Sequence, residues 1–106
     1  MVVDDHQRQM WQRMLGVIDD FETGTIDLGK AVEHLRGLYV EADPHDPDVR
    51  FGFETVWSAI DGENELRTEP WAPPGSSTEQ SLRAALDAFR RFAQTLLAPP
   101  SGSDHG

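Results

Sequence analysis

Residues 10–28 read MWQRMLGVIDDFETGTIDL, and this stretch decides the fold of the chain. Apolar side chains recur at spacings of four, three and four residues, which is the period of one face of an α-helix, at Met10, Met14, Val17 and Phe21. Gly24 follows at a position where helices commonly end, and a second apolar pattern then begins. Because only a short link separates the two patterns, the stretch predicts an antiparallel helical hairpin.

Four segments of the chain carry helical periodicity, and none alternates as a strand would. We expect helices over residues 5–22, 27–42, 47–62 and 77–97. Each segment is preceded by side chains that would accept hydrogen bonds from its first free amide groups: Asp4 or Asp5, Thr25 or Asp27, Asp46 before Pro47, and Ser76 or Ser77 at capping-box spacing from Glu79 or Gln80. Gly29 and Gly37 weaken the second helix, so either a closely packed neighbour or a locally weak helix is expected there.

Two proline-containing segments separate the later helices. Residues 43–48 form a polar loop, and residues 68–75, with three prolines, form an extended crossover. Each helix has one apolar stripe wide enough to face the other three. We therefore expect an all-α fold: a four-helix bundle in which an up-down hairpin is joined to two further helices linked by the proline-rich crossover. The bundle would be a single domain over residues 1–98, with a disordered tail at 99–106.

The acidic side chains are concentrated in one part of the sequence. The formal net charge is −10, and residues 41–69 alone hold nine acidic and two basic side chains, whereas residues 76–106 are neutral overall. Such a field repels nucleic acid and anionic membranes and attracts basic partners. We therefore expect a protein partner, no nucleic acid and no membrane. A surface that serves only solubility is the alternative explanation.

Several classes of protein are disfavoured by composition. There is no cysteine, which excludes disulfides and thiolate metal sites, and no apolar run approaches the length of about 20 residues that a membrane helix needs. The first residues show no basic leader followed by an apolar stretch. We expect a cytoplasmic protein that is a monomer when free.

No group of residues has the spacing of a catalytic or metal site. His45 lies among Asp43, Asp46 and Asp48, but these four neighbours share one loop, whereas first-row metals bind ligands that converge from a scaffold. A calcium loop starting at Asp61 would have leucine at its sixth position and alanine at its twelfth, where glycine and glutamate are needed. Paired histidines, a cysteine nucleophile and a phosphate loop are all missing from the sequence. We expect no cofactor, no metal and no enzymatic activity.

The remaining candidates for function are acidic residues and two aromatic side chains. Trp71 lies between prolines and outside any periodic stripe, so it either closes one end of the core or forms a binding hot spot ringed by acids. Phe51 lies off the stripe that begins at Val49, and we expect it to be exposed. The candidate partner-binding residues are Asp43, Asp46, Asp48, Glu54, Asp61, Glu63, Glu65, Glu69 and Trp71.

The pattern Trp11-x-x-Met14-Leu15-x-x-Ile18-x-x-Phe21-x-x-Gly24-x-Ile26-x-Leu28, followed by Leu35, Leu38 and Trp57, resembles a family of small acidic helical proteins. These are the immunity proteins encoded beside bacterial polymorphic and contact-dependent toxins. The likeness covers about half of the chain, residues 11–66. It implies a protein that neutralises a cognate toxin domain by binding it, and no individual family residue can be carried over.

Charge and resemblance together predict an immunity or antitoxin-like protein that inhibits a toxin domain. The acidic rim of the helix at 47–62 and its flanking loops would dock on a basic active-site cleft. The alternative is a non-enzymatic helical adaptor or regulatory protein, homodimeric through exposed apolar residues near Trp71 and Phe51.

Overall fold

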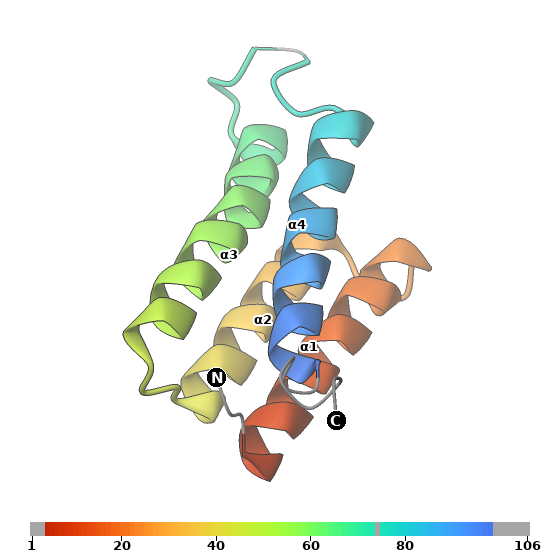
Figure 1. Ribbon diagram of the computed structural model, residues 1–106. Helices are drawn as coiled ribbons and strands as arrows, with labels where there is room; N and C mark the ends of the chain where they lie inside the picture. Colours follow the sequence, from red (N-terminus) through yellow and green to blue (C-terminus); the bar gives the residue numbers. More distant parts are fainter. Residues whose placement is uncertain (1–3, 74, 99–106) are drawn as a thin grey trace.

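The computed structural model describes residues 4–73 and 75–98, and these form an all-α four-helix bundle. The helices are α1 (Asp5–Glu22), α2 (Leu28–Ala42), α3 (Pro47–Thr68) and α4 (Glu79–Leu97). Successive helices run in opposite directions. The end of α3 and the start of α4, which the proline-rich crossover joins, reach beyond the α1–α2 hairpin (Figure 1). The predicted fold class is confirmed, while the predicted tail at 99–106 lies outside the described residues.

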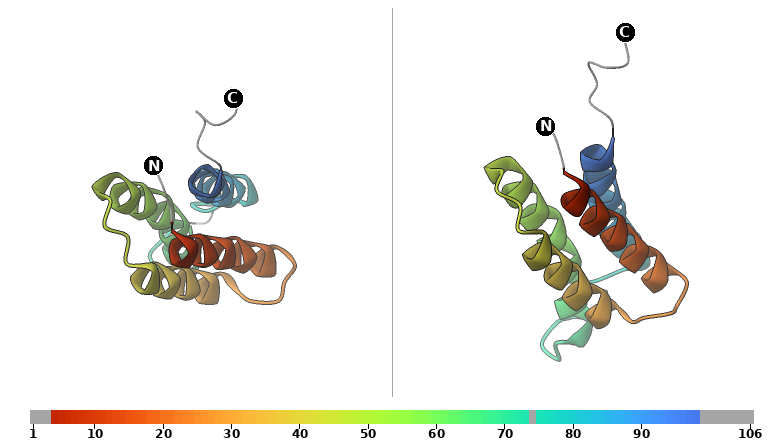
Figure 2. Two further views of the ribbon diagram at one scale, coloured as in Figure 1. Left: turned by 60° about the horizontal axis from the view of Figure 1, so that its bottom comes forward. Right: turned by 90° about the horizontal axis from the view of Figure 1, so that it is seen from below.

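The helices are arranged as a ring. Helix α1 packs on α2 and α4, and α3 packs on the same two helices, whereas in the described chain the backbones of the diagonal pairs α1–α3 and α2–α4 do not come within 8 Å of each other between Cα atoms. Figure 2 shows α1 lying beside both α2 and α4. Each helix therefore buries one stripe toward a shared core, as the periodicity predicts.

Aromatic rings from all four helices meet at the centre of this core. The fully buried ring of Phe53 stacks on Tyr39 of α2 at 3.9 Å between centroids. It also meets Trp11 of α1 at 6.2 Å and Phe89 of α4 at 5.9 Å, both edge to face. Such pairs add to the stability that burial of apolar area already provides. Among the described residues, Phe53 is thus the one side chain of α3 whose ring pairs with an aromatic ring on each of the other three helices.

Three of the four helix starts are capped as the sequence predicts, since Asp4, Asp27 and Asp46 each accept a backbone amide at 2.8 Å. The predicted start of the fourth helix is wrong by two residues. Thr78, and not Ser76 or Ser77, is the N-cap: its Oγ1 accepts from the Ser81 amide at 3.0 Å while Ser81 Oγ accepts from the Thr78 amide at 2.9 Å. Ser81, the third residue of α4, thus takes the place of the glutamate or glutamine that usually completes a capping box.

Helix α3 is longer than predicted, because it continues six residues past 62 to Thr68. The sequence there has no apolar stripe, but the last turns are held by contacts with the start of α4. Arg67 donates from Nε to Ser77 Oγ at 2.8 Å and from Nη2 to the Thr78 carbonyl at 3.3 Å. The helix ends where Pro70 forces Glu69 into an extended conformation, with φ −83° and ψ 127°.

The glycine that allows close packing is one that the sequence did not single out. A Cβ built on Gly52 of α3 would lie 2.9 Å from Cζ of Phe92 and still closer to another atom of that ring. By contrast, a Cβ on Gly37 would meet nothing within 4 Å, and one on Gly29 would make only ordinary contacts. The close-packing explanation therefore applies to Gly52, and Gly37 lies in an open stretch of α2.

Candidate interaction surface

The structure divides the predicted binding residues between the two ends of α3. Asp43, Asp46 and Asp48 surround the α2–α3 turn, whereas Glu69 and Trp71 follow the far end of the helix. Glu65 follows Asp48 by 17 positions within α3, which corresponds to about 26 Å along the helix. The exposed positions between them are occupied by Arg50, Phe51, Thr55, Ser58 and Ala59, none of which is acidic. The acids therefore do not form one continuous patch.

The acids of the α2–α3 turn have local structural roles. Asp43 is the C-cap of α2 and adopts a left-handed conformation with φ 46°, and Asp46 is the N-cap of α3. Asp48 lies in the first turn of α3, where a carboxylate interacts favourably with the helix dipole. The described residues contain no group of three or more side chains that could hold a metal ion.

Two other candidate acids are engaged within the chain. Glu54 forms an ion pair with Arg36 at 2.5 Å. The partly buried Glu63 accepts hydrogen bonds from the hydroxyls of Ser77 and Ser81, both at 2.6 Å. Glu63 thus ties the end of the crossover and the first turn of α4 to α3, and binding a partner would require it to leave these hydroxyls. Asp61 is half-buried on the same helix.

We expect Glu63→Ala to lower the free energy of unfolding by about 2 kcal/mol, because two hydrogen bonds from hydroxyls to a charged acceptor are lost. Urea denaturation followed by circular dichroism measures this. Glu65→Ala is the matched control, since Glu65 is exposed and has no cation within 4 Å among the described residues. Its expected change is below about 0.5 kcal/mol. Equal losses in the two variants would contradict the anchoring role of Glu63.

The last turn of α3 and the residues that follow it contain the exposed acids and the exposed tryptophan. We call Glu65, Glu69 and Trp71 the crossover end. The Trp71 side chain is 67% exposed. Of the two roles that its sequence context allows, closing one end of the core is therefore not the one it has. Glu65 and Glu69 are exposed, and neither forms an ion pair within the described chain. Of the two expectations for Trp71, display on the surface is the one that the geometry matches.

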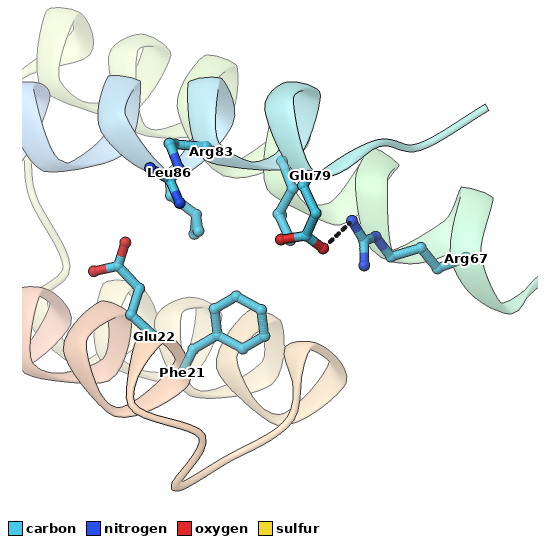
Figure 3. Close-up of a pocket in the computed structure, with 7 residues that line it drawn as sticks. Phe21, Glu22, Arg67, Glu79, Arg83 and Leu86 are labelled. Atoms are coloured by element: carbon cyan, nitrogen blue, oxygen red, sulfur yellow. Dashed lines mark ion pairs between the residues drawn. The ribbon is translucent and has the colours of Figure 1, made fainter. Parts of the chain in front are cut away.

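A cleft of 250 Å³ opens near the crossover end, between the last turn of α1 and the first turns of α4. Figure 3 shows Phe21 and Glu22 of α1 facing Arg83 and Leu86 of α4 across this space, with the Arg67–Glu79 ion pair at one side. Its lining residues are Phe21, Glu22, Arg67, Glu79, Leu82, Arg83 and Leu86. The cleft carries two acidic and two basic groups, so its charge favours neither anions nor cations.

Arg90 balances the acids on the α1 side of this cleft. It pairs with Glu22, with Asp19 at 3.4 Å and with Asp87 at 3.3 Å. Burial lowers the pKa of the Arg90 guanidinium, but the hydrogen bonds and charges of Glu22 and Asp19 raise it by more, and the pKa ends above its usual value. Arg90 therefore stays charged and joins α1 to α4.

Sequence patterns could not reveal this cleft, because Phe21, Leu82 and Leu86 each belong to a core stripe. Only the arrangement of the helix ends leaves their outer edges open.

No helix among the described residues is long and apolar enough to cross a bilayer. Comparison with known proteins identifies no relative of this chain: no protein-family model, no curated protein and no solved structure matches it.

Proposed function

We propose that this chain is an immunity protein, which binds a cognate bacterial toxin domain in the cytoplasm and neutralises it without being an enzyme. The observation that carries this proposal is the crossover end, where a tryptophan that is 67% exposed follows two exposed carboxylates, within six residues along the chain, that form no ion pair among the described residues. Exposed tryptophans are enriched among the residues that dominate binding energy in protein interfaces. In a chain with net charge −10, the complementary surface is a basic one.

The mechanism assigns different tasks to the aromatic and the acidic groups. Trp71 would insert into an apolar pocket on the toxin domain and be desolvated there, which slows dissociation. Glu65 and Glu69 would face lysines or arginines of the toxin's substrate cleft, and the wider negative field would speed the encounter. Coverage of a basic cleft blocks substrate access, and the mechanism needs no chemical step on the immunity protein.

The proposal predicts that a toxin domain is encoded beside this chain, and it is tested with that domain purified in an inactive form. We expect Trp71→Ala to accelerate dissociation about 30-fold, which corresponds to a hot-spot loss of about 2 kcal/mol. Stopped-flow fluorescence or surface plasmon resonance measures the rate. If the unaltered chain does not bind the neighbouring toxin domain, or if Trp71→Ala dissociates at the original rate, the proposed surface is wrong.

Charge reversal separates local contact from general attraction. We expect Glu65→Lys with Glu69→Lys to lower the association rate about tenfold at low salt and to flatten its dependence on ionic strength. The matched control reverses two exposed acids of α1, Asp5→Lys with Asp20→Lys, and changes the net charge equally. The control should slow association less than the crossover variant does. Equal slowing by both pairs would mean that only total charge matters.

A second candidate function is a homodimeric helical adaptor. It is favoured by two large apolar side chains near the α2–α3 turn: Val40 is 65% exposed and Phe51 is 75% exposed, as the sequence predicts for Phe51. Analytical ultracentrifugation at micromolar concentration distinguishes the two functions. The immunity function predicts a free monomer, whereas an adaptor would sediment as a dimer that Phe51→Ser dissociates.

A further inference from the structure

A shallow groove of 420 Å³ runs along the outer side of the α1–α2 hairpin, on a face that the crossover end does not include. We call it the hairpin groove. Val17 of α1 and the half-buried Leu38 of α2 form its apolar floor, and the exposed part of α2 forms its rim. Its lining residues are Val17, Glu33, His34, Gly37, Leu38 and Glu41. The two helices pack side by side along this face (Figure 2).

Gly37 keeps the groove open. A Cβ at this position would meet nothing within 4 Å, and Gly37 does not have a positive φ, so neither packing nor backbone conformation requires glycine. Glycine in the middle of a helix weakens it relative to alanine. Besides strengthening the helix, a larger side chain at 37 would occupy the groove above Val17 and Leu38. Glycine at this position thus leaves room for a side chain from another molecule.

The rim of the groove is anionic. Glu33 and Glu41 lie four residues before and after Gly37, on the same face of α2 and about 12 Å apart. Both are exposed, and neither has a lysine or arginine within 4 Å among the described residues. Glu41 also lies in the last turn of α2, where the helix dipole disfavours a carboxylate. A bound cation would relieve this unfavourable interaction.

We propose that the hairpin groove binds a cationic amphipathic helix of a partner protein. A bulky apolar side chain of that helix would rest on Val17 and Leu38 above Gly37. Lysines or arginines one turn before and one turn after it lie on the same helix face, and they would reach Glu33 and Glu41. On each helix the charged groups lie four residues to either side of the central position, which is Gly37 in α2 and the bulky apolar side chain in the partner helix. The groove and the partner helix are therefore complementary in shape and in charge.

Other occupants fit this surface less well. A second copy of this chain brings another net charge of −10 against the carboxylate rim, and an anionic lipid surface is repelled in the same way. The inference stands independently of the proposed function, because the hairpin groove and the crossover end share no residue. Failure of one leaves the other intact.

The test uses a synthetic peptide of about 15 residues, which has an alanine-based helical sequence with a central leucine and lysines four residues to either side. Titration of this peptide into the ¹⁵N-labelled full chain is followed by amide chemical shifts. We expect the shifts to be confined to the hairpin groove, and we expect Glu33→Gln with Glu41→Gln to weaken binding about tenfold. A peptide with glutamate in place of the lysines should not bind.

Filling the groove provides the decisive variant. Gly37→Leu puts a side chain into open space, so the protein stays folded, and we expect the peptide shifts to disappear. Gly62→Leu in α3 is the matched control, since a Cβ there also meets nothing within 4 Å and the residue is outside the groove. Circular dichroism checks that both variants are folded. Absence of binding to the unaltered chain, shifts at another surface, or equal binding to Gly37→Leu would each overturn the inference.

Discussion

Phe53→Ala is expected to lower the free energy of unfolding by about 4 kcal/mol, the largest loss we predict for a single substitution in this chain. The ring is fully buried and stacks on Tyr39, and its edges and face meet Trp11 and Phe89. Its removal leaves a cavity bounded by rigid aromatic groups on three other helices, which cannot all move inward. A domain of this size has a total stability of about 5–15 kcal/mol, so the variant would be marginally folded.

The control for Phe53→Ala is the same change two residues earlier in the same helix. Phe51 is 75% exposed, and Phe51→Ala should change the free energy of unfolding by less than about 0.5 kcal/mol. The two variants are compared by urea denaturation, with one shared slope (m-value) for the dependence of the unfolding free energy on urea concentration. If Phe51→Ala costs as much as Phe53→Ala, the assignment of inner and outer faces of α3 is wrong.

Gly52→Ala is expected to destabilise the protein by about 2 kcal/mol, although alanine is the better helix former. The added Cβ would overlap the ring of Phe92, with Cζ at 2.9 Å. Phe92 cannot simply rotate away, because its ring packs edge to face on the buried Trp11 at 5.6 Å. The cost of overpacking therefore exceeds the gain in helix propensity.

Gly37→Ala should have the opposite sign. No atom lies within 4 Å of the added Cβ, so only the helix propensity changes, and we expect a gain of up to about 1 kcal/mol. A double variant tests the cause: in a Phe92→Leu background the cost of Gly52→Ala should shrink, because the clashing ring is gone. Destabilisation by both glycine substitutions, or an unchanged cost in that background, would contradict this account.

The candidate site was predictable only where a residue's own helix decides its exposure. Phe51 lies off the apolar stripe of α3, so its exposure follows from the periodicity alone. Trp71 lies in a crossover with no period, and the sequence leaves open whether it packs or is displayed. The structure exposes it. Glu54 and Glu63 have the sequence context of free acids. In the structure, Glu54 forms an ion pair with Arg36, and Glu63 accepts hydrogen bonds from Ser77 and Ser81. Those partners lie on other segments, which a pattern within one helix does not reveal.

The sequence by itself determined the helices, their direction and their inward faces. Periodicity of apolar residues, aspartate caps and prolines act over distances of a few residues, and α1 accordingly begins and ends where they indicate, at Asp5 and Glu22. Only the tertiary structure decided that α3 continues past residue 62, because hydrogen bonds of Glu63 and Arg67 with the Ser77–Ser81 segment stabilise its last turns, where no apolar stripe remains. It also decided which glycine permits close packing and which leaves a groove, since that depends on the atoms a neighbouring helix brings to within 4 Å.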